Sequence, residues 1–104
     1  MKWRVSISLL ALLNLGGISQ NALAGAQEGR ELAQEWCQTC HVTEEEKPGV
    51  DVAPPWASIA NDPTKTDGIL RAWLAMPQGQ MAHIALTRQQ INDVMAYIHT
   101  LKKK

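Results

Sequence analysis

The first apolar repeat of the chain lies between Gln27 and Cys37. Polar residues separate positions at i, i+3, i+4 and i+7 that are apolar or small, namely Gly29, Leu32, Ala33 and Trp36. This spacing predicts an amphipathic helix that buries one face.

Two further helices are predicted in the second half of the chain. The earlier one carries Ile69, Leu70, Trp73 and Leu74 on one face. Thr64 or Thr66 can cap it, and it must end by Met76 because a proline follows. In the last helix, Thr87 and Gln90 form a capping box, and the apolar stripe consists of Ile91, Val94, Met95, Ile98 and Leu101.

The segments between these helices lack a clear period. Residues 42–52 and 77–85 are predicted to be loops, Pro54 and Pro55 favour extended backbone, and a short helical turn is expected over 56–61. No segment alternates with period two, so the expected fold class is all-α, with three main helices and long loops. So short a chain encloses little apolar volume, which favours a large apolar ligand at its centre.

The N-terminus has the organisation of an export signal. Lys2 and Arg4 precede an apolar run over 5–18, and Ala22-Leu23-Ala24 lies just before Gly25. This order predicts a signal peptide over residues 1–24 that is cleaved after Ala24, and one domain over 25–104. The apolar run is too short and interrupted to favour a membrane span, so no stable membrane insertion is expected after cleavage.

Charge narrows the possible partners. The chain has 10 basic and 10 acidic residues, and Lys2 and Arg4 leave with the signal, so the remaining chain has 8 basic against 10 acidic residues. This slightly acidic balance argues against a nucleic-acid partner. The acidic run Glu44–Glu46 is typical of a solvated loop, although it could also face a basic redox protein.

The strongest chemical signal is Cys37-Gln38-Thr39-Cys40-His41, a C-x-x-C-H sequence. Two thiols about one helical turn apart can add to the two vinyl groups of one porphyrin, and the adjacent imidazole can bind its iron. A thioredoxin-like pair would need a preceding strand, and a zinc site would need further ligands than His83 and His99 offer. A plain disulfide between Cys37 and Cys40 would leave His41 unexplained.

With these residues the chain resembles bacterial mono-haem members of the cytochrome c family. The resemblance runs from Glu28 to Leu101 and rests on C-x-x-C-H, Ala53-Pro54-Pro55-Trp56, Trp73-Leu74, Met81 before Leu86-Thr87, and Ala96-Tyr97-Ile98. It implies the cytochrome c fold around one haem c, bound covalently through two thioethers, with iron ligated by His41. Gly29 and Tyr97 match the place where the first and last helices of such proteins cross.

The resemblance also assigns the sixth iron ligand to Met81. From the residues alone Met76 remains a rival, although a loop near Gly79 can bring a thioether to iron more easily than a residue at a helix end. The family often has proline after this methionine, where this chain has Ala82. His83 is then either a substitute ligand or an exposed loop residue.

The same resemblance implies a supporting role for Pro54: its backbone carbonyl accepts a hydrogen bond from Nδ1–H of His41. The tryptophans Trp36, Trp56 and Trp73 favour core packing, with a bond from one indole to a haem propionate as the alternative.

These features predict a non-enzymatic electron carrier in the bacterial periplasm. Its iron would cycle between Fe(III) and Fe(II) with both axial sites filled. Expected partners are periplasmic redox proteins: a dehydrogenase as donor and an oxidase or reductase as acceptor. The alternatives are a dedicated subunit of a periplasmic dehydrogenase, or a ligand-binding haem protein if Met81 does not bind iron. The protein is expected to be a monomer or a small enzyme subunit, and no output domain indicates a redox sensor.

Overall fold

A computed structural model describes residues 17–44 and 52–103, with side chains from residue 25 onward. It contains α1 (Gly17–Leu32), a π-helical turn (Ala33–Cys37), α2 (Trp56–Ala60), α3 (Asp67–Ala75), a 3₁₀ turn (Gly79–Met81) and α4 (Arg88–Thr100). Within these ranges no strand is present, which confirms the all-α prediction with three main helices. None of the helices in these ranges is long and apolar enough to cross a membrane.

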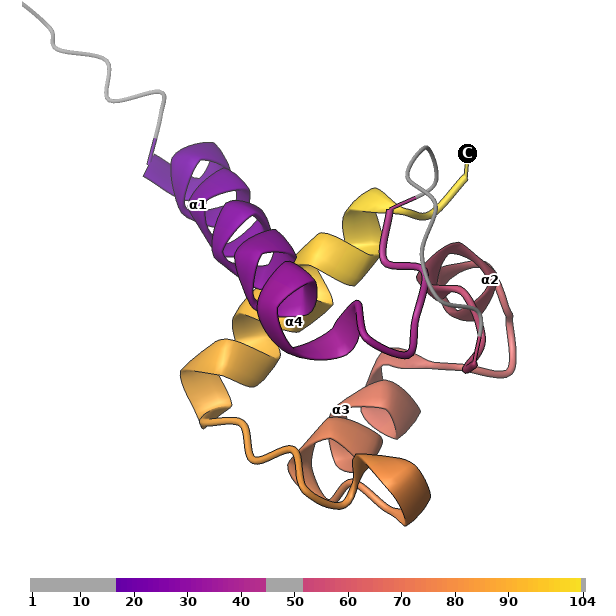
Figure 1. Cartoon of the computed structure of the whole chain (residues 1–104). Helices are drawn as coiled ribbons and strands as arrows, with labels where there is room; N and C mark the ends of the chain where they lie inside the picture. The colour runs from indigo at the N-terminus through magenta and orange to yellow at the C-terminus, as the bar shows by residue number, and fades with distance from the viewer. Residues whose placement is uncertain (1–16, 45–51, 104) are drawn as a thin grey trace, which may run out of the picture.

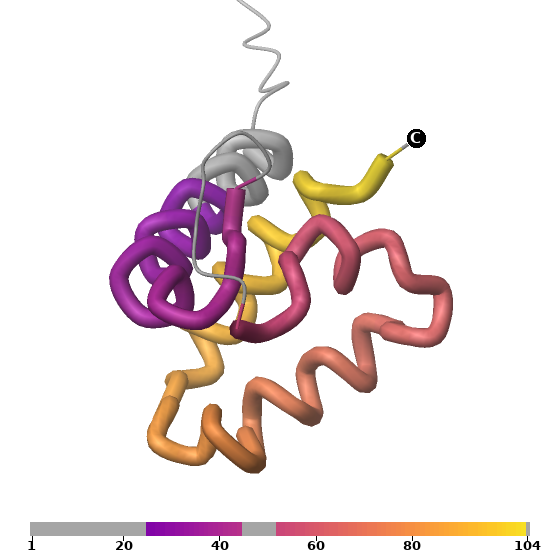
Figure 2. The backbone as a smooth tube through the Cα atoms, turned by 45° about the vertical axis from the view of Figure 1, so that its right-hand side comes forward, coloured from indigo at the N-terminus to yellow at the C-terminus, as the bar shows by residue number. Residues whose placement is uncertain are grey.

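The helices α1 and α4 cross each other, and the chain from α2 through α3 curves around one side of that pair (Figures 1 and 2). Gly29 lies at the crossing, buried against the backbone of α4. A Cβ atom at this position would overlap the carbonyl group of Asp93 and approach the nitrogen of Val94. Only glycine therefore permits this approach of the two backbones.

The last helix supplies most of the core. Its N-terminus has the predicted capping box: the Thr87 hydroxyl accepts from the Gln90 amide at 3.1 Å, and the Gln90 side chain accepts from the Thr87 amide at 2.8 Å. The buried apolar residues are Ala33, Trp56, Ala60, Leu74, Ile91, Val94, Met95, Tyr97 and Ile98. Five of them belong to α4, so this helix is the scaffold against which the other elements pack.

The N-terminal helix differs from its prediction at both ends. It begins at Gly17, ten residues before the expected start, and continues through the predicted cleavage site after Ala24. Residues 1–16, which contain most of the predicted signal, lie outside the described residues. At the other end Trp36 is 37% exposed, not buried on the predicted stripe. The cause is the π-helical turn, whose i→i+5 bond from the Gln38 amide to the Ala33 carbonyl (2.9 Å) shifts the register of the face.

The predicted face of α3 is divided between the core and a pocket. Thr66 caps this helix, with its hydroxyl accepting from the Ile69 amide at 3.3 Å. Leu74 is buried in the core, whereas Ile69 and Trp73 are 51% and 46% exposed. Apolar side chains of this size at the surface indicate a face that another group covers.

Candidate functional site

The C-x-x-C-H segment leaves the π-helical turn as a tight turn of its own. The Cys37 carbonyl accepts from the amides of Cys40 (3.2 Å) and His41 (3.0 Å), so the three residues lie within one turn. Both cysteines are half-buried free thiols. Burial raises the pKa of the Cys37 thiol to about 11, so this group is protonated at neutral pH.

His41 is held from both sides. It is 8% exposed, and its Nδ1 lies 2.7 Å from the carbonyl oxygen of Pro54. A carbonyl oxygen only accepts, so Nδ1 carries the proton and Nε2 keeps a free electron pair for a metal. The Trp56 ring meets the imidazole edge-on at a centroid distance of 6.1 Å. These contacts fix both the tautomer and the orientation of the ring.

Two backbone bonds bring Pro54 to His41. The Ala53 amide donates to the Cys40 carbonyl and the Trp56 amide donates to the Val42 carbonyl, both at 2.9 Å. The extended backbone that the two prolines impose therefore runs alongside the segment that follows the cysteines. The position of the Pro54 carbonyl is a consequence of this pairing.

A buried tyrosine supports the same region from α4. Tyr97 is 6% exposed, its ring centroid lies 6.0 Å from that of Trp56, and its hydroxyl donates to the Thr43 carbonyl at 2.6 Å. Burial raises the pKa of the Tyr97 phenol, and the nearby Glu44 carboxylate adds to this effect. The last helix thus reaches the imidazole through an unbroken series of aromatic contacts.

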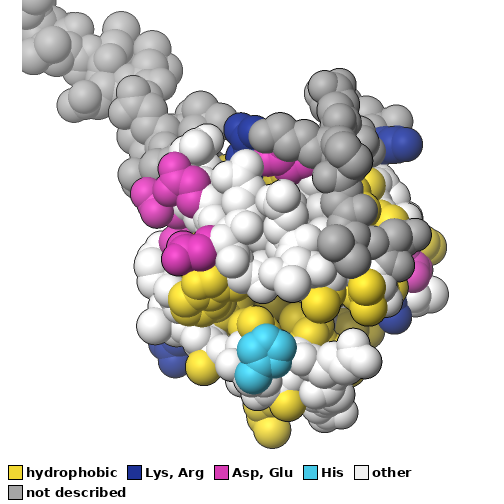
Figure 3. All heavy atoms as spheres, in the orientation of Figure 1, with side chains coloured by type: hydrophobic (Ala, Val, Ile, Leu, Met, Phe, Trp, Pro, Cys, Tyr) yellow, Lys and Arg dark blue, Asp and Glu magenta, His cyan; other side chains and the backbone are white. Residues whose placement is uncertain are grey.

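An apolar pocket of about 260 Å³ opens beside this segment. Its lining residues are Pro54, Ile59, Lys65, Ile69, Leu70, Trp73 and Met81. Figure 3 shows hydrophobic side chains gathered in a band across this face of the molecule. A second hollow of about 390 Å³ is lined by Trp36, His83, Ile84 and Ala85.

The two candidate methionines lie in different surroundings. Met81 is half-buried in the apolar pocket, where the indole Nε1 of Trp73 donates to its sulfur at 3.4 Å. Met76 is 74% exposed at the end of α3 and does not line that pocket. His83 is exposed and lies in the loop between the 3₁₀ turn and α4.

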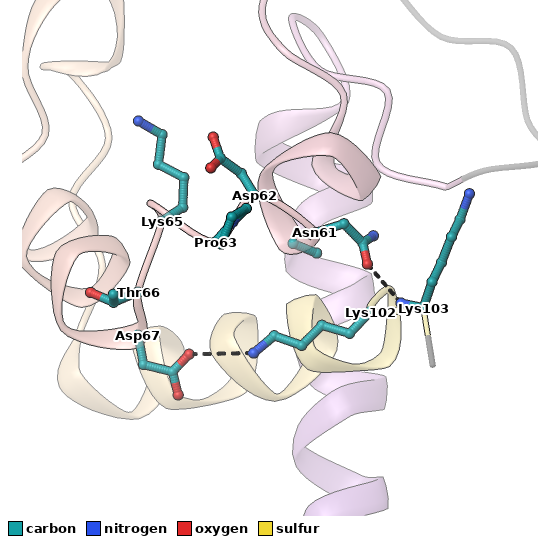
Figure 4. Close-up of a pocket in the computed structure, with 9 residues that line it drawn as sticks. Asn61, Asp62, Pro63, Lys65, Thr66, Asp67, Lys102 and Lys103 are labelled. Atoms are coloured by element: carbon teal, nitrogen blue, oxygen red, sulfur yellow. Dashed lines mark hydrogen bonds and ion pairs between the residues drawn. The ribbon is translucent and has the colours of Figure 1, made fainter.

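A separate polar pocket joins the start of α3 to the end of α4 (Figure 4). The Asp67 carboxylate lies 2.9 Å from His99 Nε2 and 3.9 Å from Lys102 Nζ, and the Lys103 amide donates to the Asn61 side chain at 2.7 Å. The His99 bond lowers the pKa of Asp67. These contacts join α3 to α4. Neither cysteine lines this pocket, and its wall is largely polar.

The donor set defines the class of protein. One covalently held haem fits this set of groups. The set consists of a buried imidazole whose Nδ1 is bonded to a carbonyl, two free thiols in one turn, a thioether and an apolar pocket. The structure thus has the features of a c-type haem protein.

Comparison with known proteins gives the family. The sequence profile of the cytochrome c family matches residues 26–102. Cytochrome c-552 of Bradyrhizobium diazoefficiens is 34% identical over 94 residues, which covers 88% of this chain and 89% of that protein. No solved structure matches the chain at a significant level. The chain belongs to the cytochrome c family, and it is accordingly a non-enzymatic electron carrier with covalent haem c in the cytochrome c fold.

Sequence reasoning missed two contacts near this site and one buried acidic residue. Trp73 was expected in the core, but its indole binds the Met81 sulfur. Arg30 binds Glu44 at 2.8 Å, so the first residue of the acidic run is already paired within the chain, while Glu45 and Glu46 lie outside the described residues. Asp93 is buried on the inner side of α4. The first two contacts have no local sequence signal, because each partner lies on another element. The burial of Asp93 depends on the approach of α1, which local patterns do not show.

Proposed function

We propose that this protein is a periplasmic electron carrier whose haem iron is ligated by His41 and Met81. One observation carries the proposal: the wall of a single apolar pocket contains both Met81 and Pro54, and the Pro54 carbonyl binds His41. This arrangement supports the proposal that His41 and Met81 serve the same haem. The exposed position of Met76 argues against it as the sixth ligand.

The roles of the residues follow from this arrangement. Cys37 and Cys40 form the two thioether bonds, and the bond from His41 to Pro54 keeps the imidazole in the tautomer that binds iron. The haem supplies an iron that accepts and releases one electron. The His41 imidazole and the Met81 thioether would hold the iron in both oxidation states, so that little would rearrange during transfer, and a thioether ligand would favour ferrous iron.

Export and partners are part of the proposal. The basic residues, apolar run and Ala22-Leu23-Ala24 support cleavage after Ala24 and a periplasmic location. Periplasmic redox proteins, a dehydrogenase as donor and an oxidase or reductase as acceptor, would dock through small contacts below about 1,200 Å² in total. A dedicated subunit of one dehydrogenase would instead co-purify with that enzyme.

The test is the visible spectrum of the holoprotein, oxidised and reduced, with Met81→Ala and Met76→Ala compared. We expect a c-type reduced spectrum, and a sulfur-to-iron charge-transfer band that disappears in Met81→Ala and persists in Met76→Ala. Met76→Ala is the matched control because it removes the same side chain from an exposed position.

Three results would contradict the proposal. A protein without bound haem would overturn its centre. Loss of the sulfur band in Met76→Ala alone would assign the sixth iron ligand to Met76 in place of Met81. Rapid carbon monoxide binding to the reduced native-sequence protein would show an open iron site and favour a ligand-binding haem protein.

A further inference from the structure

The inner side of α4 carries a buried acidic group, Asp93, for which the described residues provide no basic partner. Asp93 is 8% exposed, and the hydrogen bond to its carboxylate comes from Gln89 of the same helix, at 2.9 Å. Within the described part of the chain no lysine, arginine or histidine forms an ion pair with it. A buried carboxylate is costly unless an opposite charge compensates it, so this position calls for a cation.

Gly29 faces the backbone of Asp93, and Gly25 faces its carboxylate. A Cβ atom built on Gly25 would lie 3.4 Å from Asp93 Oδ1 and 3.7 Å from the Ala96 Cβ. Gly25 lies one turn before Gly29, on the same face of the helix that crosses α4. Outside α1, the described residues place only these two side chains within 4 Å of the Cβ position of Gly25.

Gly25 is also the residue that the predicted cleavage would leave at the N-terminus. In the full chain its nitrogen is an amide inside α1. After cleavage between Ala24 and Gly25 the same nitrogen would become an ammonium group with three donors. The ammonium nitrogen is bonded to the Cα atom of Gly25, and a Cβ atom placed on that Cα would lie 3.4 Å from Asp93 Oδ1.

We propose that Asp93 binds the α-ammonium group that cleavage creates on Gly25, and that this ion pair fastens the start of the shortened α1 to α4. The inference rests on the proposed export of the chain, since an uncleaved chain has no charge at Gly25. It gives the buried carboxylate the cation that the described residues do not supply.

Electrostatics favours this pair over a solvated terminus. A free ammonium at a helix N-terminus opposes the helix dipole, whereas a carboxylate there is favourable. Asp93 would therefore compensate both the terminal charge and the dipole of α1. Glu28, the nearest acidic residue along α1, is exposed and lies one turn further on, where water screens its charge.

The position of the cut is decisive for the geometry. Each residue added to the helix moves the terminus by about 1.5 Å along the axis and about 100° around it. Cleavage one residue earlier or later would turn the ammonium group away from α4. The proposal therefore requires Gly25, and not a neighbour, as the first residue.

The experiment uses the holoprotein, exported and processed from all 104 residues of the sequence. Intact mass establishes the first residue, and visible absorbance on the same sample measures the haem. The pKa of the terminal amine is then measured from the pH dependence of its acylation, in the native-sequence protein and in Asp93→Asn. Glu28→Gln is the matched control, because it removes an equal charge from an exposed position near the terminus.

We expect an amine pKa about one unit above its ordinary value of about 7.7–8.0 in the native-sequence protein and in Glu28→Gln. Acylation at neutral pH would then be about tenfold slower than in the urea-unfolded protein. In Asp93→Asn the ordinary value should return. If Asp93→Asn fails to fold, an ordinary amine pKa in the folded native-sequence protein still overturns the ion pair, and Asp93→Ser supplies the second charge-removing variant.

Three outcomes would overturn the ion pair. These are an ordinary amine pKa in the folded native-sequence protein, a raised pKa that persists in Asp93→Asn, and a first residue other than Gly25. Failure of the haem proposal is read separately: a processed protein with a raised amine pKa and no haem absorbance would contradict that proposal alone.

Discussion

The indole nitrogen of Trp73 donates a hydrogen bond to the sulfur of Met81 at 3.4 Å. A thioether sulfur has two lone pairs, so it can accept this proton and still offer the other pair to iron. The bond withdraws electron density from the sulfur, and a weaker donor favours the electron-rich ferrous state. Trp73 would thus tune the redox centre without touching the iron.

We predict that Trp73→Phe lowers the reduction potential while the haem remains attached. If the bond is worth about 1 kcal/mol more in the ferrous state, the shift is about 40 mV, since 59 mV corresponds to a tenfold change for one electron. Potentiometric titration measures it. Trp36→Phe is the control, because Trp36 is also half-exposed but lines the other hollow. An unchanged or higher potential in Trp73→Phe would refute the tuning role.

Gly29 sets the distance between the two crossing helices, so a side chain there should be costly. A Cβ atom would overlap the Asp93 carbonyl, and backbone atoms cannot move aside as a flexible side chain can. We expect Gly29→Ala to lower the free energy of unfolding by about 3 kcal/mol, the upper range for overpacking. Denaturant unfolding of the holoprotein measures this.

Gly68 provides the control for that substitution. A Cβ atom on Gly68 would meet nothing within 4 Å, and the residue lies exposed in α3. Gly68→Ala should therefore stabilise the protein slightly, by up to about 1 kcal/mol, through helix propensity. Equal effects at the two glycines would mean that the crossing does not depend on the missing side chain.

The Tyr97 hydroxyl satisfies a buried carbonyl. Thr43 is 3% exposed and its carbonyl accepts from that hydroxyl at 2.6 Å, so Tyr97→Phe would leave the carbonyl unpaired. We expect a loss of about 1–3 kcal/mol in the free energy of unfolding at pH 7. Thr64→Val removes an exposed hydroxyl, bound to Asp62, and should change stability by less than about 0.5 kcal/mol.

The same phenol predicts a dependence of stability on alkaline pH. Burial raises the pKa of Tyr97 in the folded protein, so folding disfavours the phenolate. The contribution of the protonated phenol to the free energy of unfolding is complete below the pKa of tyrosine in the unfolded chain, about 10. This contribution is lost as the pH rises through the higher pKa of Tyr97 in the folded protein. Unfolding measured from pH 8 to 11 should thus show a shallower alkaline decline in Tyr97→Phe. An unchanged slope would contradict this assignment.

The accuracy of the sequence-based predictions depended on how local their signals were. The capping box at Thr87 and the stripe of α4 involve only residues of one helix and its ends, and both are confirmed. Leu101 is the exception in that stripe, since it is only half-buried at the helix end. The exposure of Trp36 was not foreseen, because the π-helical turn beneath it has no propensity signal.

Contacts between distant segments were beyond local patterns. Asp93 reads as a polar position in α4, and only the approach of α1 at Gly29 makes it a buried carboxylate. The bond from His41 to Pro54 uses a backbone oxygen, which any residue could supply. Resemblance to a family pointed to that contact, whereas spacing could not.

The apolar pocket leads to a last prediction, on removal of the haem. Ile69 and Trp73 are about half exposed, and the apolar core consists of few residues, of which α4 supplies most. The haem would cover the exposed side chains, and its binding free energy would add to the free energy of folding. The double variant Cys37→Ser/Cys40→Ser cannot form thioethers and should lose most of its helical circular dichroism at 25 °C. Thr39→Ser, in the same motif, keeps both thiols and should melt like the native-sequence protein. Cooperative, native-like melting of the haem-free double variant would show instead that the polypeptide core alone is sufficient for folding.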